Sequence, residues 1–147
     1  MKASSGFSVL EMVVVLVLLS LILGVFLVRM RGSSDQIKSE TARGDLRSIQ
    51  KAINNYYLNH ASVFPSGSDW QNNDLVNDNP RTLRQILYDP FRAAHTEYSY
   101  FLSPNGKYFV AFSYGPNDLA GITGINDNAQ LTGTAGDDIF VTNGASG

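Results

Sequence analysis

Few side chains in this sequence could do chemistry, and those few do not form a catalytic set. The 147 residues include no cysteine and two histidines, His60 and His95. Without cysteine the chain can form neither a disulfide, a thiolate metal site nor a thiol nucleophile. The histidines lie far apart in sequence with no ligand or triad spacing around them, so each is interpreted as a surface residue. No nucleophile, base and orienting group stand together, so we expect a protein that is not an enzyme.

The segment from Asp118 to Gly147 has the one concentration of groups that could bind a ligand. It is rich in glycine, asparagine and threonine, contains no lysine or arginine, and holds four aspartates: Asp118, Asp127, Asp137 and Asp138. Such a segment should bury little apolar surface, so we expect either a mobile acidic tail or a loop closed by a cation. Carboxylates and backbone carbonyls are the oxygen ligands that Ca²⁺ prefers.

Known calcium motifs match this segment only in part. The aspartate spacing does not fit an EF-hand loop, which needs acids at alternating positions before a glycine. The stretch Gly133–Ile139 resembles one calcium-binding nonapeptide repeat, but those repeats work in tandem and this sequence has a single copy.

The overall charge is nearly balanced. Eleven Lys and Arg residues stand against 13 Asp and Glu, a formal net charge of -2. Duplex binding relies on a basic surface, so no nucleic-acid partner is expected. A chain of 147 residues that is 44% hydrophobic is long enough for about one folded domain.

The sequence has a long apolar run near its N-terminus. From Phe7 to Val28 the only ionisable side chain is Glu11. As a helix this run would reach about 33 Å, enough for a hydrocarbon core of about 30 Å. A cleaved secretory signal is the alternative, but its apolar region is usually about 7–15 residues long and ends at a small-residue cleavage site. This longer run leads instead into Arg29 and Arg31, so we predict a retained transmembrane segment.

Glu11 needs an explanation inside such a run. A carboxylate within an apolar span costs about 2.5–3.5 kcal/mol on insertion scales, so it usually has a function and a partner. Because Glu11 is close to one end, it could instead lie at the membrane interface.

The first residues carry a family resemblance. The leader Lys2–Gly6, followed by Phe7–Glu11 and the apolar run, resembles the prepilin signal of type IV pilins and type II secretion pseudopilins. The resemblance implies that residues 1–6 are a leader peptide, cut between Gly6 and Phe7 by a prepilin peptidase that also methylates Phe7. It further implies that residues 7–28 stay in the product as a transmembrane and polymerisation segment. Glu11 is then an assembly residue that pairs with the Phe7 amine of a neighbouring subunit.

The flanking charges disagree with the orientation that this family uses. Lys2 stands alone on the N-terminal side, whereas five cations follow the run: Arg29, Arg31, Lys38, Arg43 and Arg47. The positive-inside rule would place the C-terminal side in the cytoplasm. The resemblance implies a single-pass inner-membrane protein with its C-terminal part in the periplasm, and we follow the resemblance.

Residues 29–58 are predicted to continue the helix as an amphipathic half. The apolar residues Ile37, Leu46, Ile49 and Ile53, with Tyr56 or Tyr57, follow three- and four-residue spacing. The whole helix should therefore run from Phe7 to about Leu58. One side of its second half should pack against the rest of the chain.

Residues 59–147 are predicted to form a globular part with a C-terminal acidic loop. Loop residues fill the stretch up to Pro80, and a short helix is expected at Thr82–Tyr88, with Leu83, Ile86 and Leu87 facing inward, before Asp89-Pro90 stops it. Alternating aromatic residues at 98–102 and 108–114, separated by Pro104-Asn105-Gly106, predict a β-hairpin in the core.

The resemblance extends into this globular part. Asp89–Phe91 resembles an Asp-Pro-aromatic turn of the family, and Ser113–Gly121 is similar to the glycine-acid loop of major pseudopilins. Asp137-Asp138-Ile139 is similar to the acidic pair that closes their calcium site. The resemblance therefore implies a structural calcium ion held by Asp118, Asp137 and Asp138, with Asn117 and Asp127 as further candidates.

These observations together predict an α+β, pilin-like subunit: a long N-terminal helix, half of it transmembrane, packed against a small antiparallel sheet. The resemblance implies a pseudopilin that polymerises into a periplasmic pseudopilus driving type II protein secretion. The alternative is a major or minor type IV pilin for adhesion, motility or DNA uptake. The implied partners are further copies of the chain in a helical filament, the prepilin peptidase, an inner-membrane assembly platform and minor pseudopilins.

Overall fold

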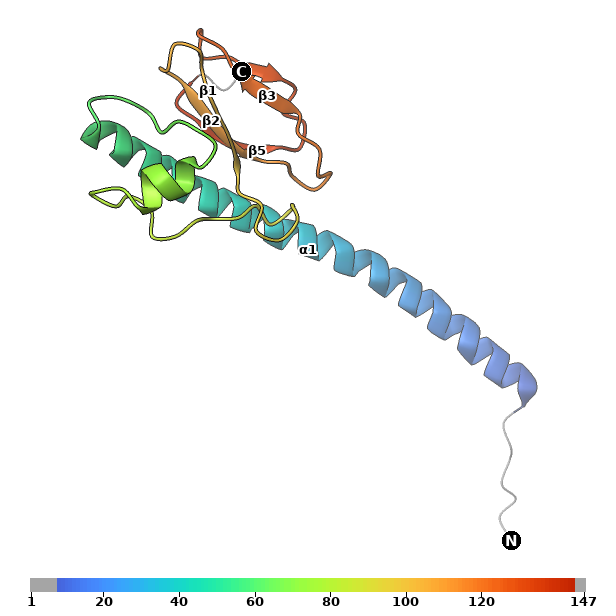
Figure 1. Cartoon of the computed structure of the whole chain (residues 1–147). Coiled ribbons are helices and arrows are strands. Elements are labelled where there is room, and N and C mark those ends of the chain that lie inside the picture. The colour runs from blue at the N-terminus through green and yellow to red at the C-terminus, as the bar shows by residue number, and fades with distance from the viewer. Residues whose placement is uncertain (1–7, 145–147) are drawn as a thin grey trace. The chain divides into compact units, whose positions relative to one another are not determined.

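The computed structural model describes the backbone of residues 8–144 and the side chains of residues 8–25 and 34–144. A helix, α1 (Val9–Asn59), is followed by a six-residue π-helix, η1 (Gln71–Val76). Five short strands follow: β1 (Ser99–Leu102), β2 (Phe109–Ser113), β3 (Ile122–Ile125), β4 (Leu131–Gly133) and β5 (Ile139–Thr142). The chain is therefore α+β, an N-terminal helix followed by small antiparallel sheets (Figure 1).

The chain divides into an N-terminal unit, Met1–Gln36, and a C-terminal unit, Ile37–Gly147. In the N-terminal unit the carbonyl of Ser8 accepts hydrogen bonds from the amides of Glu11 and Met12, at 3.0 and 3.1 Å, and α1 begins there. The large apolar side chains of residues 9–25 are between 45% and 80% exposed. Within the part of the chain that the structure describes, no helix combines the length and hydropathy that a membrane span needs.

The predicted leader, with the cleavage and methylation sites at Gly6 and Phe7, lies outside the described residues. The helix bounds that the sequence predicts, Phe7 to about Leu58, agree closely with Val9–Asn59 over the described part.

In the C-terminal unit one side of α1 forms the core. Buried helix residues recur at three- and four-residue spacing and pack against strand residues such as Phe109 and Ala111; they are Ala42, Leu46, Ile49, Ala52 and Ile53. This confirms the predicted stripe over most of its length. Ile37 is the exception, because it is 66% exposed and the buried stripe begins only at Ala42.

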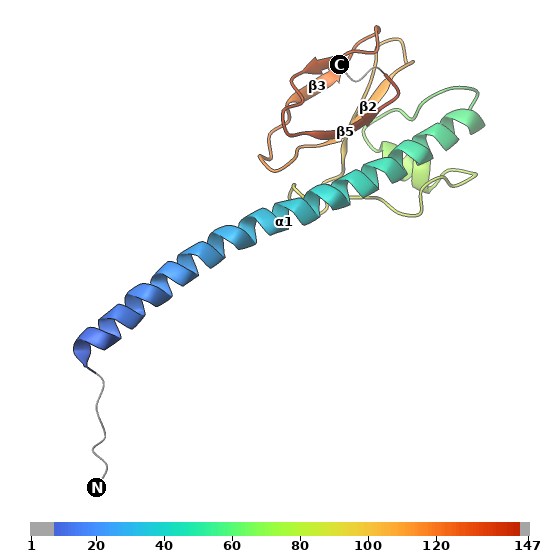
Figure 2. The same cartoon turned by 180° about the vertical axis from the view of Figure 1, so that it is seen from behind.

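Strand β2 is the centre of the fold. It pairs antiparallel with β1 on one side and β5 on the other, while β3 and β4 form a second, two-stranded sheet. Its residues alternate between two environments: Phe109 and Ala111 pack against α1, whereas Val110 and Phe112 pack with Ile122 of the second sheet. Both faces of β2 are therefore buried, which confirms the predicted hairpin and the core position of its aromatic residues. Figure 2 shows β2 and β5 beside the second half of α1.

The predicted short helix at Thr82–Tyr88 is wrong. The amides of Thr82 and Leu83 both donate to the carbonyl of Leu75, at 3.0 and 2.9 Å. The side chain of Gln71 bonds both the amide and the carbonyl of Leu87, at 3.0 and 3.1 Å. These distant partners replace the bonds that a helix would make within itself, and the helical turn lies instead at η1, in a segment predicted as loop.

The expectation that Asp118–Gly147 buries little apolar surface is also wrong. This segment contains β3, β4 and β5, and its residues Ile122 and Ile125 are only 1% and 5% exposed. The alternative of a mobile acidic tail therefore fails for residues 118–144.

Candidate functional site

Two glycines let the acidic C-terminal segment lie directly against the loop after β2. A Cβ atom on Gly115 would stand 2.3 Å from the carbonyl oxygen of Asp137, and Gly115 has a φ of +67° that favours glycine. A Cβ atom on Gly121 would stand 2.0 Å from the carbonyl oxygen of Thr134. Only glycine permits this approach, so residues 115–121 and 134–138 form one compact arrangement, here called the cation site.

Asp137 contacts this loop through its carboxylate. Its Oδ2 accepts a hydrogen bond from the amide of Asn117 at 3.0 Å, and its Oδ1 accepts one from the Asn117 side-chain amide. The Asn117 side-chain oxygen accepts in turn from the amide of Leu119, at 2.6 Å. Asp137 and Asn117 are both exposed, so this end of the site is open to solvent and ions.

Asp138 is the buried member of the pair, at 8% exposure. Its Oδ2 accepts hydrogen bonds from the amides of Gly121 and Ile122, at 2.9 and 2.8 Å. Its Oδ1 is buried and has no hydrogen-bond partner. Burial raises the pKa of Asp138, and the charges of Asp137 and Asp89 raise it further, although the two amides oppose the shift. A buried carboxylate oxygen without a partner is costly, and a cation would remove that cost.

Asp89 is a buried acid whose role the sequence did not predict, beyond its place in an Asp-Pro turn. At 3% exposure its Oδ1 accepts from the amide of Phe91 at 3.0 Å and from the hydroxyl of Ser113 at 2.7 Å. Its Oδ2 accepts from the amide of Tyr114 at 3.1 Å. Asp89 thus ties the turn at Pro90 to the end of β2, where the cation-site loop begins. An aspartate before proline was the signal that could have suggested a side-chain-capped turn.

The other two predicted ligands lie differently. The Asp118 carboxylate forms an ion pair with Arg92, with Nε to Oδ1 at 3.6 Å. The Asp127 carboxylate accepts a hydrogen bond from the amide of Asn105 at 2.8 Å, in the turn between β1 and β2. The structure therefore brings Asn117, Asp137 and Asp138 together, places Asp118 one residue away from this group, and leaves Asp127 elsewhere.

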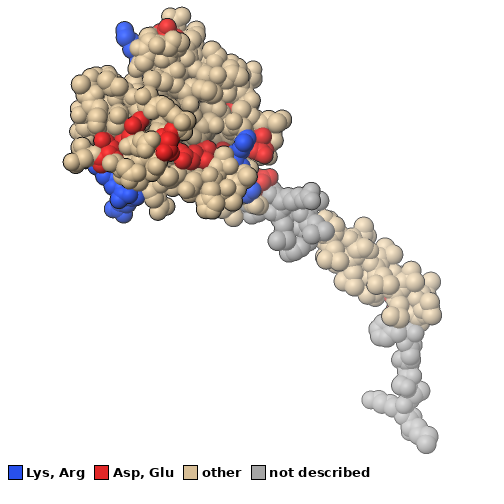
Figure 3. Space-filling view, viewed as in Figure 1, with Lys and Arg blue, Asp and Glu red and all other residues tan. Residues whose placement is uncertain are grey.

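The side chains of the cation site are of the chemical types that calcium binds. Among the described residues no three Asp, Glu, His or Cys side chains gather closely enough to hold a metal ion by themselves. Calcium, however, takes 6–8 oxygen ligands and accepts amide and backbone carbonyls beside carboxylates. Asp137 and Asp138 supply carboxylate oxygens, including the Asp138 Oδ1 without a partner, and Asn117 supplies an amide oxygen that also accepts from the amide of Leu119. On the face seen in Figure 3 the acids of the C-terminal unit form a band with basic groups beside it.

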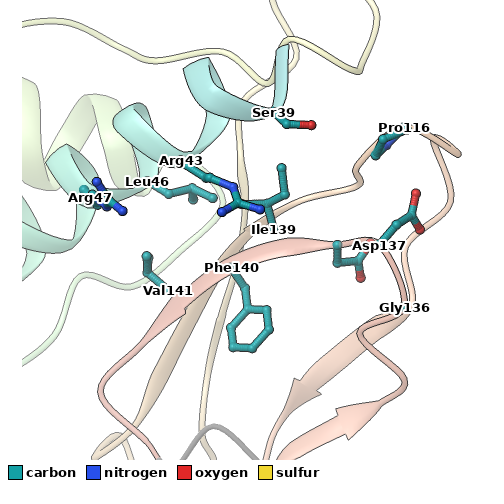
Figure 4. A pocket seen from close by; sticks show the side chains of 11 residues that line it. Ser39, Arg43, Leu46, Arg47, Pro116, Gly136, Asp137, Ile139, Phe140 and Val141 are labelled. Carbon is teal, nitrogen blue, oxygen red and sulfur yellow. The ribbon is translucent and has the colours of Figure 1, made fainter. Parts of the chain in front are cut away.

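An open pocket of about 580 Å³ reaches the cation site from the side of α1. Arg43, Leu46 and Arg47 line it from the helix, and residues 136–141 line it from the opposite wall. In Figure 4 the Arg43 side chain reaches over Ile139, while the Asp137 carboxylate turns to the far side. The pocket therefore borders Asp137 and Asp138 on the side where two arginines of α1 lie.

Glu11 lies in the first turn of α1, where a carboxylate is favoured by the helix dipole. Its side chain is exposed, and no described cation lies within ion-pair distance of it. The two histidines have partners outside the cation site: His60 pairs with Asp78 at 3.2 Å, and His95 packs edge-on against Tyr88.

No protein-family model, curated protein or solved structure matches this chain.

Proposed function

We propose that this chain is a pseudopilin, a structural subunit that polymerises into a periplasmic pseudopilus and drives type II protein secretion. The observation that carries the proposal is the contrast within α1. Residues 9–25 expose their apolar side chains, whereas residues 42–53 form the core of the C-terminal unit. An exposed apolar surface of this extent marks contact with a membrane or with other protein chains.

The N-terminal motif supplies the proposed route to assembly. A prepilin peptidase removes residues 1–6, methylates Phe7 and leaves its amine four positions before Glu11. In the filament the amine of one subunit pairs with Glu11 of its neighbour. Either charge alone is costly in an apolar environment, and pairing offsets part of that cost. Glu11 thereby fixes the stagger between subunits.

The proposed location follows from the same motif. The subunit begins as a single-pass inner-membrane protein with its leader in the cytoplasm and its C-terminal unit in the periplasm. There it meets the secretion assembly platform and the minor pseudopilins, and it joins the periplasmic filament.

We also propose that the C-terminal unit holds a structural calcium ion at the cation site. Asp137 and Asp138 would hold it, with Asn117 and Asp118 as neighbouring oxygen donors. The ion supplies positive charge beside two adjacent carboxylates and cross-links residues 115–121 to residues 134–138. Support comes from the buried Asp138 Oδ1 without a partner and from a chain without cysteine, which has no disulfide to do the same.

Processing is tested by co-expressing the chain with a prepilin peptidase and measuring intact mass. We expect loss of residues 1–6 and one added methyl group on Phe7. Gly6→Val should block the cut by crowding the scissile bond, whereas Gly24→Ala, which meets no atom within 4 Å, should be processed normally. Retention of the leader beside an active peptidase would contradict the proposal.

The secretion role is tested in two host strains. The chain should restore secretion in a strain that lacks its major pseudopilin, and it should not restore surface pili in a strain that lacks its major pilin. The reverse pattern would identify it as a type IV pilus subunit.

Calcium binding is tested by thermal melting of the full chain in a non-ionic detergent. A ligand that binds only the folded state adds about 2.7 kcal/mol of stability at 100 times its Kd, so the melting temperature should rise with calcium and fall with chelator. The response should vanish in the double variant Asp137→Asn/Asp138→Asn. It should persist in Asp127→Asn, which is the same aspartate-to-asparagine change outside the site. Magnesium should substitute poorly, because it demands a tight octahedral shell. An identical melting curve with calcium and with chelator would remove the calcium assignment.

A further inference from the structure

Arg92 places a positive charge at the edge of the cation site. Its guanidinium lies over the ring of Tyr114, 4.1 Å from the ring centroid, and pairs with the Asp118 carboxylate at 3.6 Å. Tyr114 is the first residue after β2, and Asp118 closes the turn that follows, with its amide donating to the carbonyl of Gly115 at 3.2 Å. The arginine therefore contacts both ends of the Tyr114–Asp118 turn.

The fold holds Arg92 in this place. Its own amide donates to the carbonyl of Asp89 at 3.2 Å, and the Asp89 carboxylate bonds Ser113 and the amide of Tyr114. The segment that carries Arg92 and the strand end that leads to Asp118 are thus both hydrogen-bonded to Asp89, one through its carbonyl and the other through its carboxylate.

The Arg92–Asp118 ion pair can separate readily. The side chains of Arg92 and Asp118 are 33% and 59% exposed, and solvent weakens exposed pairs of this kind. Asp118 also follows Asn117 directly, and Asn117 bonds Asp137. A cation bound beside Asp137 and Asp138 would therefore attract the Asp118 carboxylate and repel the Arg92 guanidinium.

We propose that Arg92 is a tethered counter-cation of this site, which pairs with Asp118 when calcium is absent and competes with calcium for that carboxylate. The proposal rests on the calcium site proposed above. Arg92 has two effects: it holds the loop together in the empty state, and it lowers the affinity of the site for calcium. Calcium therefore binds to a loop that is already closed, at a concentration that Arg92 helps to set.

The test uses the full chain in a non-ionic detergent, with calcium as the only ligand, by titration calorimetry and thermal melting. Exposed ion pairs contribute about 0.2–1 kcal/mol, so Arg92→Gln should bind calcium about 1.4- to fivefold more tightly. In chelator the same variant should melt at a lower temperature than the wild type. Lys107→Gln, which removes one positive charge in the turn between β1 and β2, is the matched control and should change neither quantity.

A double-mutant comparison isolates the pair itself. In chelator, Asp118→Asn should lower the melting temperature of the wild type but should have a smaller effect in Arg92→Gln, because the pair is already lost. Arg92→Lys keeps the charge and should give a calcium affinity between those of the wild type and Arg92→Gln.

Two results overturn the proposal and differ from each other. If the wild type binds calcium and Arg92→Gln binds it equally or more weakly, Arg92 does not compete and the calcium site stands. If the wild type binds no calcium, the site itself is wrong and the role of Arg92 falls with it.

Discussion

Two stretches of the same helix have opposite surroundings. In residues 9–25 the apolar side chains cover every side of α1 and are exposed, whereas residues 42–53 place theirs on one side, where they are buried. The second stretch has polar residues between its apolar ones. Its apolar side can therefore be buried against the rest of the same chain while its polar side faces water. The first has only Glu11 and Ser20 as polar residues, so its apolar surface requires a membrane or other chains. One helix thus combines a part that folds by itself with a part that requires assembly.

Glu11→Ala should have the largest effect, and it should reduce filament assembly without changing the stability of the C-terminal unit. Removing one partner of a buried ion pair costs about 3–5 kcal/mol, so filament yield, measured by shearing and sedimentation, should fall by about tenfold or more. Leader cleavage and the melting temperature of the C-terminal unit should stay unchanged. Glu40→Ala, an exposed acid of α1 in the C-terminal unit, is the control. Wild-type filament yield in Glu11→Ala would show that this acid sets no subunit contact.

Leu46→Ala should instead lower the folding stability of the C-terminal unit. Leu46 is fully buried, and truncating a buried leucine costs about 2–5 kcal/mol. Chemical denaturation followed by circular dichroism should show this loss. Leu16→Ala removes the same atoms from a side chain that is 62% exposed and should leave the unfolding free energy of the C-terminal unit unchanged. Equal losses in the two variants would contradict the contrast between the two halves.

Gly121→Ala and Gly44→Ala should change stability with opposite signs. At Gly121 a Cβ atom would meet the Thr134 carbonyl oxygen at 2.0 Å, so the loop must shift and Asp138 must lose its amide partners. We expect a destabilisation of about 1–3 kcal/mol and weaker calcium binding. Gly44 lies within α1 with no atom within 4 Å of an added Cβ, so alanine there should stabilise the unit by about 0.5–1 kcal/mol. Melting in chelator and in calcium measures both.

Glu97→Gln should have the smallest effect, visible as a change in pH dependence. Burial raises the pKa of Glu97 above 4.5, and the nearby charge of Asp69 adds to the shift. An acid with a raised pKa in the folded state stabilises the fold below its ordinary pKa, and this stabilisation is lost as pH rises through the folded value. The melting temperature of the wild type should therefore decline above about pH 4.5 more than that of Glu97→Gln, which can keep a hydrogen bond to Gln71. If the melting temperatures of the wild type and Glu97→Gln change equally with pH, the charged form of Glu97 does not destabilise the fold.

Sequence patterns predicted the parts of the fold that depend on neighbouring residues. The stripe on α1 and the β1–β2 hairpin both follow from local spacing, because a helix face and a tight turn are set by residues close in sequence. Thr82–Tyr88 misled the same reasoning. Its leucines are spaced as in a helix, but its backbone bonds go to Leu75 and Gln71, which no local pattern can indicate.

The candidate site divides in the same way. The resemblance implied Asp118, Asp137 and Asp138, with Asn117 and Asp127 as further candidates. The structure brings Asn117, Asp137 and Asp138 together but pairs Asp118 with Arg92. The motif did not indicate that Asp89 holds the loop from behind or that Arg92 pairs with Asp118, since these partners come from another part of the chain. Strand β5 was missed for a related reason, because it is stabilised by pairing with β2 rather than by its own sequence.

The order of the strands in the chain has a consequence for the order in which the C-terminal unit folds. Strand β5 pairs with β2, the central strand, but β3 and β4 lie between them in the sequence. Pairing strands across a long connection costs loop-closure entropy before the new hydrogen bonds offset it. The β1–β2 hairpin, which a short turn connects, should therefore form early, and β5 should complete the three-stranded sheet late.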